Sequence, residues 1–251
     1  MLPSEKFLAA FRSHDEAPRT LVERAYLGLR HDIVCGALVP GERLRVEHLK
    51  ARYDVGAGTL REALSLLLSD ALVTAEGQRG FRVAPISLAD LTDITNTRVM
   101  LETEALRLSI RHGGAAWEAA LTAAFERLSE AERSPERMRG AEWEDANRAF
   151  HEALIAGHDS PWSRYLLGIL YRHAERYRYI AMRVVSAEAG PPRDVHREHE
   201  DLYRAAIGRQ EARAARALEA HVRNTCEVLK KAGLGVRAIA LAIARSLCMA
   251  D

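Results

Sequence analysis

The feature that most constrains this chain is a pair of short helical patterns within residues 46–68, joined by a tight turn. The first pattern covers residues 46–53. The second begins near Leu60 and carries apolar residues at the i, i+4, i+7 and i+8 positions, namely Leu60, Leu64, Leu67 and Leu68. Such a stripe predicts a helix packed on one face. Thr59 and Glu62 have the spacing of a capping box, which predicts that this second helix starts near Leu60.

The segments on either side extend this pattern into a small domain over residues 21–85. Upstream, the apolar spacing in Leu21–Cys35 predicts a third helix, which Gly36 ends. Downstream, Leu72–Thr74 and Phe81–Val83 are β-prone runs separated by turn residues, so they predict a hairpin. Three helices followed by a hairpin, in this order, predict a winged helix-turn-helix whose second patterned helix enters the major groove of DNA.

Pairs of amphipathic helices are common, so a helix pair alone is weak support for DNA binding, whereas the full order of elements favours it. Arg61 falls in the first turn of the predicted recognition helix, where side chains meet base edges. The basic tip of the hairpin is expected to reach a minor groove. The residues that we expect to contact DNA are Arg43, Arg45, Thr59, Arg61, Gln78 and Arg79.

Several short motifs of this domain are Pro40-Gly41-Glu42-Arg43-Leu44, Leu60-Arg61-Glu62-Ala63-Leu64 and Gly80-Phe81-Arg82-Val83. Together they resemble the N-terminal domain of GntR-family bacterial transcription regulators. The chain departs from that family where Gly56-Ala57-Gly58-Thr59 stands in place of the usual Ser-Arg-Thr-Pro, so that a frequent DNA-contacting arginine is Ala57 here. This variant and the sequence after it are similar to a branch of regulators that control glutarate and 2-hydroxyglutarate breakdown.

Composition bounds the other possibilities. The chain has 251 residues, 48% of them hydrophobic, so it is long enough for two domains with separate cores. A net charge of +1 offers no global attraction to nucleic acid. We therefore expect DNA affinity to come from a local DNA-binding patch, which is present twice in a dimer. Three scattered cysteines and the lack of any apolar run of membrane-span length predict a cytoplasmic protein with no membrane segment.

After a short link at residues 84–87, the sequence is almost wholly helical as far as residue 231. Six amphipathic segments with short connections predict an antiparallel bundle. The expected fold class is therefore mainly α, with a winged helix-turn-helix followed by an all-α helix bundle. The expected parts are an N-terminal arm (1–20), the DNA-binding domain (21–85), the effector-binding and dimerisation bundle (88–232) and a C-terminal tail (233–251).

A set of polar residues stands at apolar positions of the bundle. Asn147 and His151 are four residues apart, so both emerge on one helix face. His199 and His221 lie on the last two helices, and three imidazoles from three helices suit a borderline divalent ion. These four residues match the metal motif of the FCD effector domain, which the bundle resembles over about Leu88–Lys230. The resemblance implies a site for Zn²⁺, Ni²⁺ or Mn²⁺, with His196 as an outer neighbour or a surface residue.

A carboxylate group of a small effector would bind at an open coordination position on such an ion. An arginine would hold the second carboxylate group of the same effector. FCD proteins often keep a cavity-facing arginine at the position of Arg98, although Arg98 has an equal claim as an exposed partner of Glu102. Arg176 is favoured among the arginines of the fourth bundle helix. We therefore expect a dimeric repressor released from DNA by a dicarboxylate such as glutarate. The alternatives are a metal-dependent enzyme, which no His-Glu-x-x-His pattern supports, and a ligand-independent DNA binder.

Overall fold

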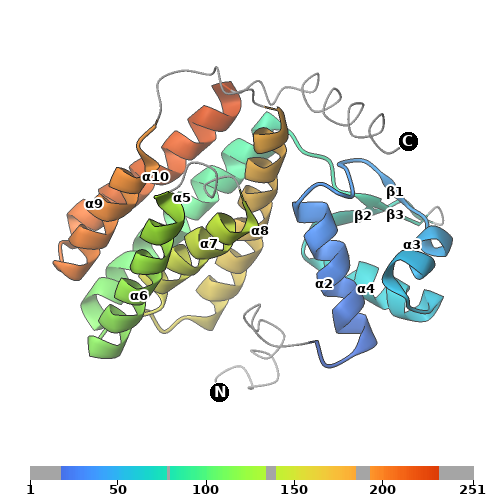
Figure 1. Ribbon diagram of the computed structural model, residues 1–251, viewed down its shortest axis with the longest axis horizontal. Helices are drawn as coiled ribbons and strands as arrows, with labels where there is room; N and C mark the ends of the chain where they lie inside the picture. The colour runs from blue at the N-terminus through green and yellow to red at the C-terminus, as the bar shows by residue number, and fades with distance from the viewer. Residues whose placement is uncertain (1–17, 78–79, 134–139, 185–192, 232–251) are drawn as a thin grey trace. The chain divides into compact units, whose positions relative to one another are not determined.

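The computed structural model of the protein describes residues 18–77, 80–133, 140–184 and 193–231 (Figure 1). It is mainly helical, with a winged helix-turn-helix before an all-α bundle, which confirms the predicted fold class. Contacts divide the chain into two compact units. The first holds the described residues up to Leu88 together with Arg172–Val184, and the second holds Ala89–Tyr171 together with residues 193–231. The expected C-terminal tail, and all of the expected arm before Pro18, lie outside the described residues.

The first unit has one apolar core, built by α2 (Leu21–Val34), α3 (Val46–Tyr53) and α4 (Ala57–Ser69). The Thr20 side chain caps α2 by accepting the Glu23 N–H at 3.1 Å. Asp54 ends α3 with a left-handed φ of 50°, which turns the chain sharply towards α4. The innermost side chains are fully buried and come from α2, α4, the segment after α4 and the hairpin, namely Leu29, Ile33, Leu60, Leu64, Leu67, Leu72 and Val83.

A three-stranded antiparallel sheet completes this unit, with strand order β1-β3-β2. β2 (Val73–Ala75) and β3 (Phe81–Val83) form the predicted hairpin, in which Val73 pairs with Val83. β1 (Arg43–Leu44) adds on the other side of β3, with Leu44 opposite Phe81. The sequence did not predict β1, because two residues are too few to show an alternating pattern.

Three predictions about α4 are wrong: its start at a capping box, the place of Arg61 in the first turn, and the burial of Leu68. The helix starts at Ala57, where the Leu60 N–H bonds the Gly56 carbonyl at 3.1 Å, and it has no side-chain cap because its N-cap residue is Gly56. Thr59 and Glu62 therefore form no capping box, and Arg61 lies in the second turn instead of the first. Leu68 is 42% exposed, because a helix rotates about 100° per residue and Leu68 falls at the edge of the buried stripe. Ala63, on the opposite flank, is buried instead.

Among the described residues, six helices form the bundle (Figure 1). They are α5 (Leu88–His112), α6 (Ala115–Glu132), α7 (Ala141–Ile155), α8 (Pro161–Val184), α9 (Val195–Ile207) and α10 (Glu211–Lys231). The core of the second unit is formed by buried residues from each of these helices, including Leu106, Leu121, Phe150, Leu167, Leu202 and Leu218. α8 passes from one unit to the other between Tyr171 and Arg172. Within the described ranges, no helix is long and apolar enough to cross a membrane.

Candidate nucleic-acid interface and metal centre

The basic side chains expected to contact DNA are accessible where the structure describes them. Arg43 on β1, Arg45 before α3 and Arg61 on α4 are exposed, and Thr59 is half-buried. Within the described part of the chain, Arg45 and Arg61 form no ion pair, so their charges are available to a phosphate. Gln78 and Arg79, at the hairpin tip, lie outside the described residues. These positions suit DNA contact.

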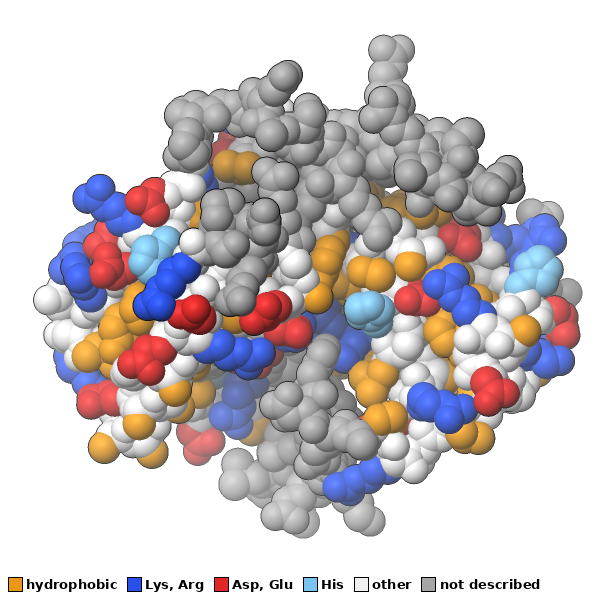
Figure 2. Space-filling model, viewed as in Figure 1, with side chains coloured by type: hydrophobic (Ala, Val, Ile, Leu, Met, Phe, Trp, Pro, Cys, Tyr) orange, Lys and Arg blue, Asp and Glu red, His pale blue; other side chains and the backbone are white. Residues whose placement is uncertain are grey.

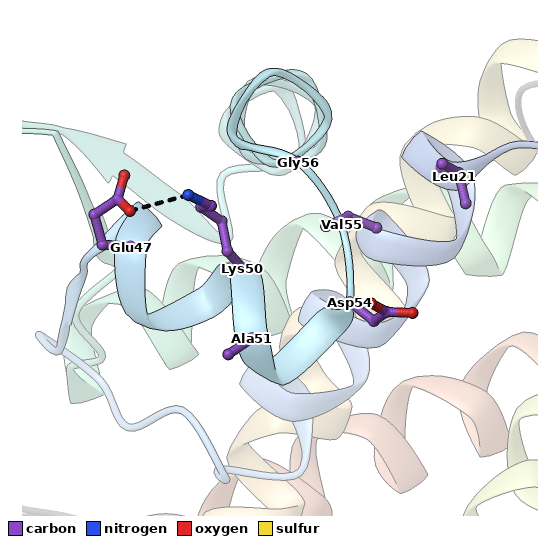
Figure 3. A pocket seen from close by; sticks show the side chains of 7 residues that line it. All are labelled: Leu21, Glu47, Lys50, Ala51, Asp54, Val55 and Gly56. Atoms are coloured by element: carbon purple, nitrogen blue, oxygen red, sulfur yellow. Dashed lines mark hydrogen bonds and ion pairs between the residues drawn. The ribbon is translucent and has the colours of Figure 1, made fainter.

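The start of the recognition helix has a second property that suits a phosphate backbone. Gly56 precedes α4 with extended backbone, and no side chain among the described residues caps the first N–H groups. Such a helix end carries a partial positive charge. Figure 3 shows the shallow recess beside it, lined by residues of the α3–α4 turn and by Leu21, with Lys50 paired to Glu47 at 3.1 Å.

The surface in view in Figure 2 mixes acidic and basic side chains over the described residues, in keeping with the net charge of +1. A protein needs no face-wide basic field to bind DNA, because a few well-placed arginines can supply the phosphate contacts. Arg82 on β3 is already neutralised: its Nε lies 2.7 Å from Glu76 Oε1. The exposed Arg43, Arg45 and Arg61 are thus the described basic residues of greatest interest in this unit.

In the second unit, three of the four predicted metal ligands converge. His151 on α7, His199 on α9 and His221 on α10 form the histidine cluster, in which one ligand atom from each residue lies within 4.8 Å of the others. Their exposed fractions are 4%, 0% and 7%, so water does not solvate them freely. Asn147, one turn before His151 on α7, is also buried, at 5%.

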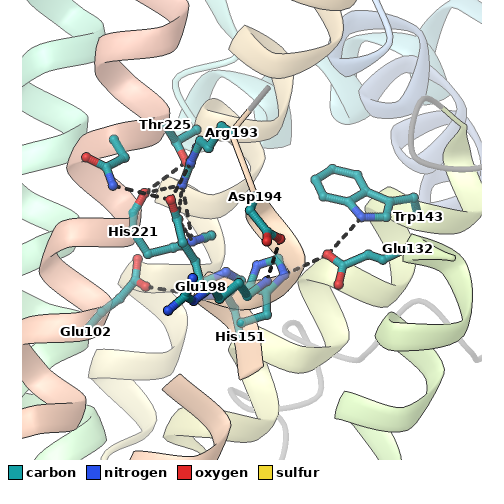
Figure 4. A network of polar contacts seen from close by, with 12 residues as sticks. Glu102, Glu132, Trp143, His151, Arg193, Asp194, Glu198, His221 and Thr225 are labelled. Carbon is teal, nitrogen blue, oxygen red and sulfur yellow. Dashed lines mark hydrogen bonds and ion pairs between the residues drawn. The ribbon is translucent and has the colours of Figure 1, made fainter. Parts of the chain in front are cut away.

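Two of these imidazoles have a defined hydrogen-bond partner on one side of the ring (Figure 4). His199 Nδ1 lies 2.7 Å from Glu132 Oε1, and His221 Nδ1 lies 2.8 Å from Glu198 Oε2. Each Nδ1 carries the proton and donates, because an ionised carboxylate only accepts. His199 Nε2 is buried and has no hydrogen-bond partner in the described structure. A buried nitrogen with an unused lone pair is suited to coordinate a cation.

The electrostatics of the site keep the His221 imidazole neutral and the Glu132 and Glu198 carboxylates charged. Burial lowers the pKa of His221 to about 3, although its hydrogen bond to Glu198 acts in the opposite direction. Burial alone would raise the pKa of Glu198, but hydrogen bonds from Arg193 and His221 outweigh it and hold that pKa at about 2. Glu132 follows the same pattern: burial opposes ionisation, yet hydrogen bonds from His199, His196 and Trp143 lower its pKa.

The sequence left two interpretations open for Arg98. The structure shows a buried ion pair: Arg98 Nε lies 2.6 Å from Glu102 Oε1, and the two side chains are only 7% and 1% exposed. The Arg98 guanidinium also lies over the Tyr171 ring, 4.9 Å from its centroid. Because the Tyr171 ring is 6.2 Å from that of His151, Arg98 lies close to the histidine cluster.

The structure describes Arg176 with other neighbours than those of the histidine cluster. α8 leaves the second unit at Tyr171, and Arg176 belongs to the first unit, where its Nη2 donates to the Ala84 carbonyl. The sequence pattern of this helix carried no information about where the helix changes neighbours. His196, predicted as an outer neighbour or a surface residue, is both: its side chain is 47% exposed, and its Nδ1 lies 2.9 Å from Glu132 Oε2.

Sequence reasoning missed the glutamates that surround the cluster. Glu132 ends α6 and Glu198 directly precedes His199, and each reads as an ordinary surface residue. The whole Glu132 residue is 8% exposed, and Trp143 Nε1 donates to its side chain at 3.4 Å. No local signal identifies such a residue, because its partner is 67 positions away in the chain.

A second group of possible ligands, His31, Asp32 and Cys35, also has its ligand atoms within 4.8 Å of one another. It is a poor metal site, because Asp32 Oδ2 already accepts hydrogen bonds from Arg52 Nη2 and from the Tyr53 hydroxyl, each at 2.6 Å. The remaining described histidines follow expectation: His31, His48 and His112 are exposed, His173 is half-buried, and His158 is a core residue at 2% exposure. His14 lies outside the described residues.

Comparisons with known sequences agree with both units. Residues 21–83 match the family "Bacterial regulatory proteins, gntR family", and residues 93–224 match the "FCD domain" family. The chain is 44% identical over 220 residues to "Uncharacterized HTH-type transcriptional regulator BphR" of Paraburkholderia xenovorans (strain LB400), covering 86% of this chain and 88% of that protein. It is 36% identical over 212 residues to "HTH-type transcriptional repressor GlaR" of Escherichia coli (strain K12), covering 84% and 96%.

Solved structures agree on the fold. The structure of "E. coli McbR/YncC" has a TM-score of 0.70 at 20% identity and covers 84% of this chain and 98% of its own. A putative transcriptional regulator GntR from Rhodococcus sp. RHA1 has a TM-score of 0.64 at 22% identity, covering 83% and 97%. At these identities the likeness supports the architecture alone.

Proposed function

Since the chain belongs to the GntR family of bacterial regulatory proteins and carries an FCD domain, we propose that it is a transcriptional repressor controlled by a small carboxylate. Its family and relatives are transcription regulators, so it is a regulator and not an enzyme. In the proposed mechanism it binds operator DNA as a homodimer, and a carboxylate bound beside a divalent metal ion in the bundle releases it. The observation that carries this proposal is the buried histidine cluster in the second unit.

The residues of the cluster fit a metal ion. Asn147, His151, His199 and His221 are all buried, and neutral imidazole is the form that binds Zn²⁺, Ni²⁺ or Mn²⁺. The buried Nε2 of His199, which no described residue satisfies, is costly without a partner and would be satisfied by coordination. When bound, the ion would supply an electrophilic position for a carboxylate oxygen.

Arg98 is the residue that we propose for the second carboxylate of the effector. Its guanidinium has five N–H donors, and the Nε donor is committed to Glu102. Its remaining N–H groups lie in the guanidinium plane and can bind a carboxylate edge-on, and burial beside Tyr171 strengthens such a contact. A dicarboxylate such as glutarate has the two groups that this arrangement requires, and the resemblance to regulators of glutarate breakdown agrees with that choice.

DNA release would follow from a population shift. A ligand changes the DNA affinity only if it binds one arrangement of the dimer better than the other. Typical coupling free energies of about 1–3 kcal/mol correspond to about 5–150-fold in affinity. In this proposal, the recognition helices α4 of the two protomers lose the separation that matches two half-sites on one face of DNA. Arg43, Arg45, Thr59 and Arg61, together with Gln78 and Arg79, are the proposed DNA contacts.

A competing interpretation is that the metal is structural and that no small molecule controls DNA binding. One observation favours it: Arg98 already has a carboxylate partner, Glu102, without any ligand. The two interpretations differ in one measurable property, which is whether glutarate changes the operator affinity of the metal-loaded protein.

The test is a fluorescence-anisotropy titration of the protein with DNA from its own promoter, with and without glutarate. The protein is purified without chelator, and its metal content is measured by mass spectrometry. We expect glutarate to lower DNA affinity for the wild type but much less for Arg98→Lys, which keeps a cation for Glu102 but lacks the fork. Stoichiometric metal with no glutarate response would favour the structural-metal alternative, and absence of metal would overturn the metal site itself.

A further inference from the structure

Each imidazole of the histidine cluster has a glutamate on its Nδ1 side, and each glutamate comes from a different helix (Figure 4). Glu132 on α6 is 2.7 Å from His199 Nδ1, and Glu198 on α9 is 2.8 Å from His221 Nδ1. Glu102 on α5 lies further off, with Oε2 3.9 Å from His151 Nδ1. We call Glu102, Glu132 and Glu198 the outer glutamates.

The outer glutamates are themselves held in place by donors on the side away from the cluster. Arg98 holds Glu102 at 2.6 Å, and His196 and Trp143 hold Glu132. Arg193 binds both oxygens of Glu198, with its Nε 2.8 Å from Oε1, and the same arginine donates to Thr225 Oγ1 and to the His221 carbonyl. The Glu102 and Glu132 side chains are each 1% exposed and that of Glu198 is 24% exposed, so these acceptors are fixed.

A fixed acceptor at Nδ1 decides which nitrogen of a neutral imidazole carries the proton. With the proton on Nδ1, the lone pair sits on Nε2, on the far side of the ring. The buried, unpartnered Nε2 of His199 agrees with this arrangement. A carboxylate in this position also makes the ligand more basic and restricts rotation of the ring.

We propose that the outer glutamates, above all Glu132 and Glu198, are positioning residues that make the histidine cluster bind metal through Nε2. This inference rests on the metal site of the proposed function and adds the residues that orient it. Glu132 and Glu198 act through the closest contacts, and the 3.9 Å separation makes Glu102 the weaker member.

The same residues determine the charge that an effector meets. The three outer glutamates and the two arginines that hold them, Arg98 and Arg193, sum to one negative charge. A divalent ion turns this into one positive charge. A carboxylate is therefore repelled by the metal-free site and attracted by the loaded one, which makes effector binding conditional on metal.

The test compares Glu132→Gln and Glu198→Gln with wild type and with Glu219→Gln, which removes an exposed carboxylate paired with Arg223 on α10. Zn²⁺ affinity is measured on the full chain by competition with a chromogenic chelator. The imidazole tautomers of the metal-free protein are read from ¹⁵N chemical shifts. We expect each cluster variant to bind Zn²⁺ about 10–100-fold more weakly, while Glu219→Gln stays at the wild-type value. The Nδ1–H signal of the affected histidine should be lost or reduced.

The outcomes separate the two proposals. Wild-type protein that binds no Zn²⁺ would overturn the metal site and this inference together. Wild-type protein that binds Zn²⁺, with unchanged affinity in both glutamine variants, would overturn the positioning role and leave the metal site standing. A lower melting temperature of the metal-free variants with unchanged Zn²⁺ affinity would count against the proposal as well, because it would show a purely structural carboxylate.

Discussion

Removal of the Arg98 guanidinium should destabilise the second unit far more than removal of a surface arginine. Arg98 and Glu102 form an ion pair that is almost entirely buried, with side-chain exposures of 7% and 1%. Arg98→Ala leaves the Glu102 carboxylate buried without its 2.6 Å donor. Breaking such a pair from one side costs about 3–5 kcal/mol, because the remaining charge is desolvated and uncompensated. Loss of the cation–π contact with Tyr171 adds about 0.5–2 kcal/mol.

The matched control is Arg107→Ala on the same helix. Arg107 Nη1 lies 3.7 Å from Glu104, and both side chains are largely exposed, at 44% and 58%. An exposed pair of this kind contributes about 0–1 kcal/mol. The free energy of unfolding would be measured in urea by tryptophan fluorescence, because all three tryptophans, Trp117, Trp143 and Trp162, lie in the second unit.

A second variant distinguishes charge burial from lost packing. Replacing the pair with Arg98→Met and Glu102→Gln removes both charges and keeps most of the volume, so it should recover most of the lost stability. If Arg98→Ala is no more destabilising than Arg107→Ala, the reasoning about a stranded buried charge is refuted. The same result would make Arg98→Ala a clean test of the effector response, which the expected destabilisation otherwise prevents.

Three further predictions concern the two units separately. Arg61→Ala should weaken operator binding by about 1–3 kcal/mol per half-site with an unchanged circular dichroism spectrum, and unaltered affinity would contradict the assignment of α4. Alanine at any one histidine of the cluster should lower the bound metal and the melting temperature and abolish the glutarate response, while DNA binding persists. A chelator should have the same effect on the wild type. A histidine variant that retains stoichiometric metal would refute this prediction. Leu64→Ala should cost about 2–5 kcal/mol of unfolding free energy, whereas Leu68→Ala should cost less than about 1 kcal/mol, because Leu64 is fully buried and Leu68 is 42% exposed. Equal losses in a denaturant titration would contradict the burial pattern.

The sequence predicted the helices well because helix formation follows local rules. α3 begins and ends at the predicted residues 46 and 53, since apolar periodicity acts within a few positions. The start of α4 was predicted wrongly because two local signals, the Thr59–Glu62 spacing and Gly56, indicate different first residues. The Thr59–Glu62 spacing suggested a cap, but the backbone had already entered the helix three residues earlier at Gly56. A short strand such as β1 depends on its partner β3, so its own sequence carried no signal.

The sequence alone determined which residue types line the centre of the bundle: Asn147, His151, His199 and His221 stand beside apolar residues, which puts them on inward helix faces. Their convergence and everything around them were decided by the tertiary structure. Glu132 meets His199 across 67 positions, and Arg98 is buried instead of exposed because Tyr171 covers it. Arg176 has its described neighbours in the first unit, because α8 passes from the second unit to the first after Tyr171. Contacts between distant segments depend on how helices pack, which depends on the summed shape of many side chains and not on the pattern of any one helix.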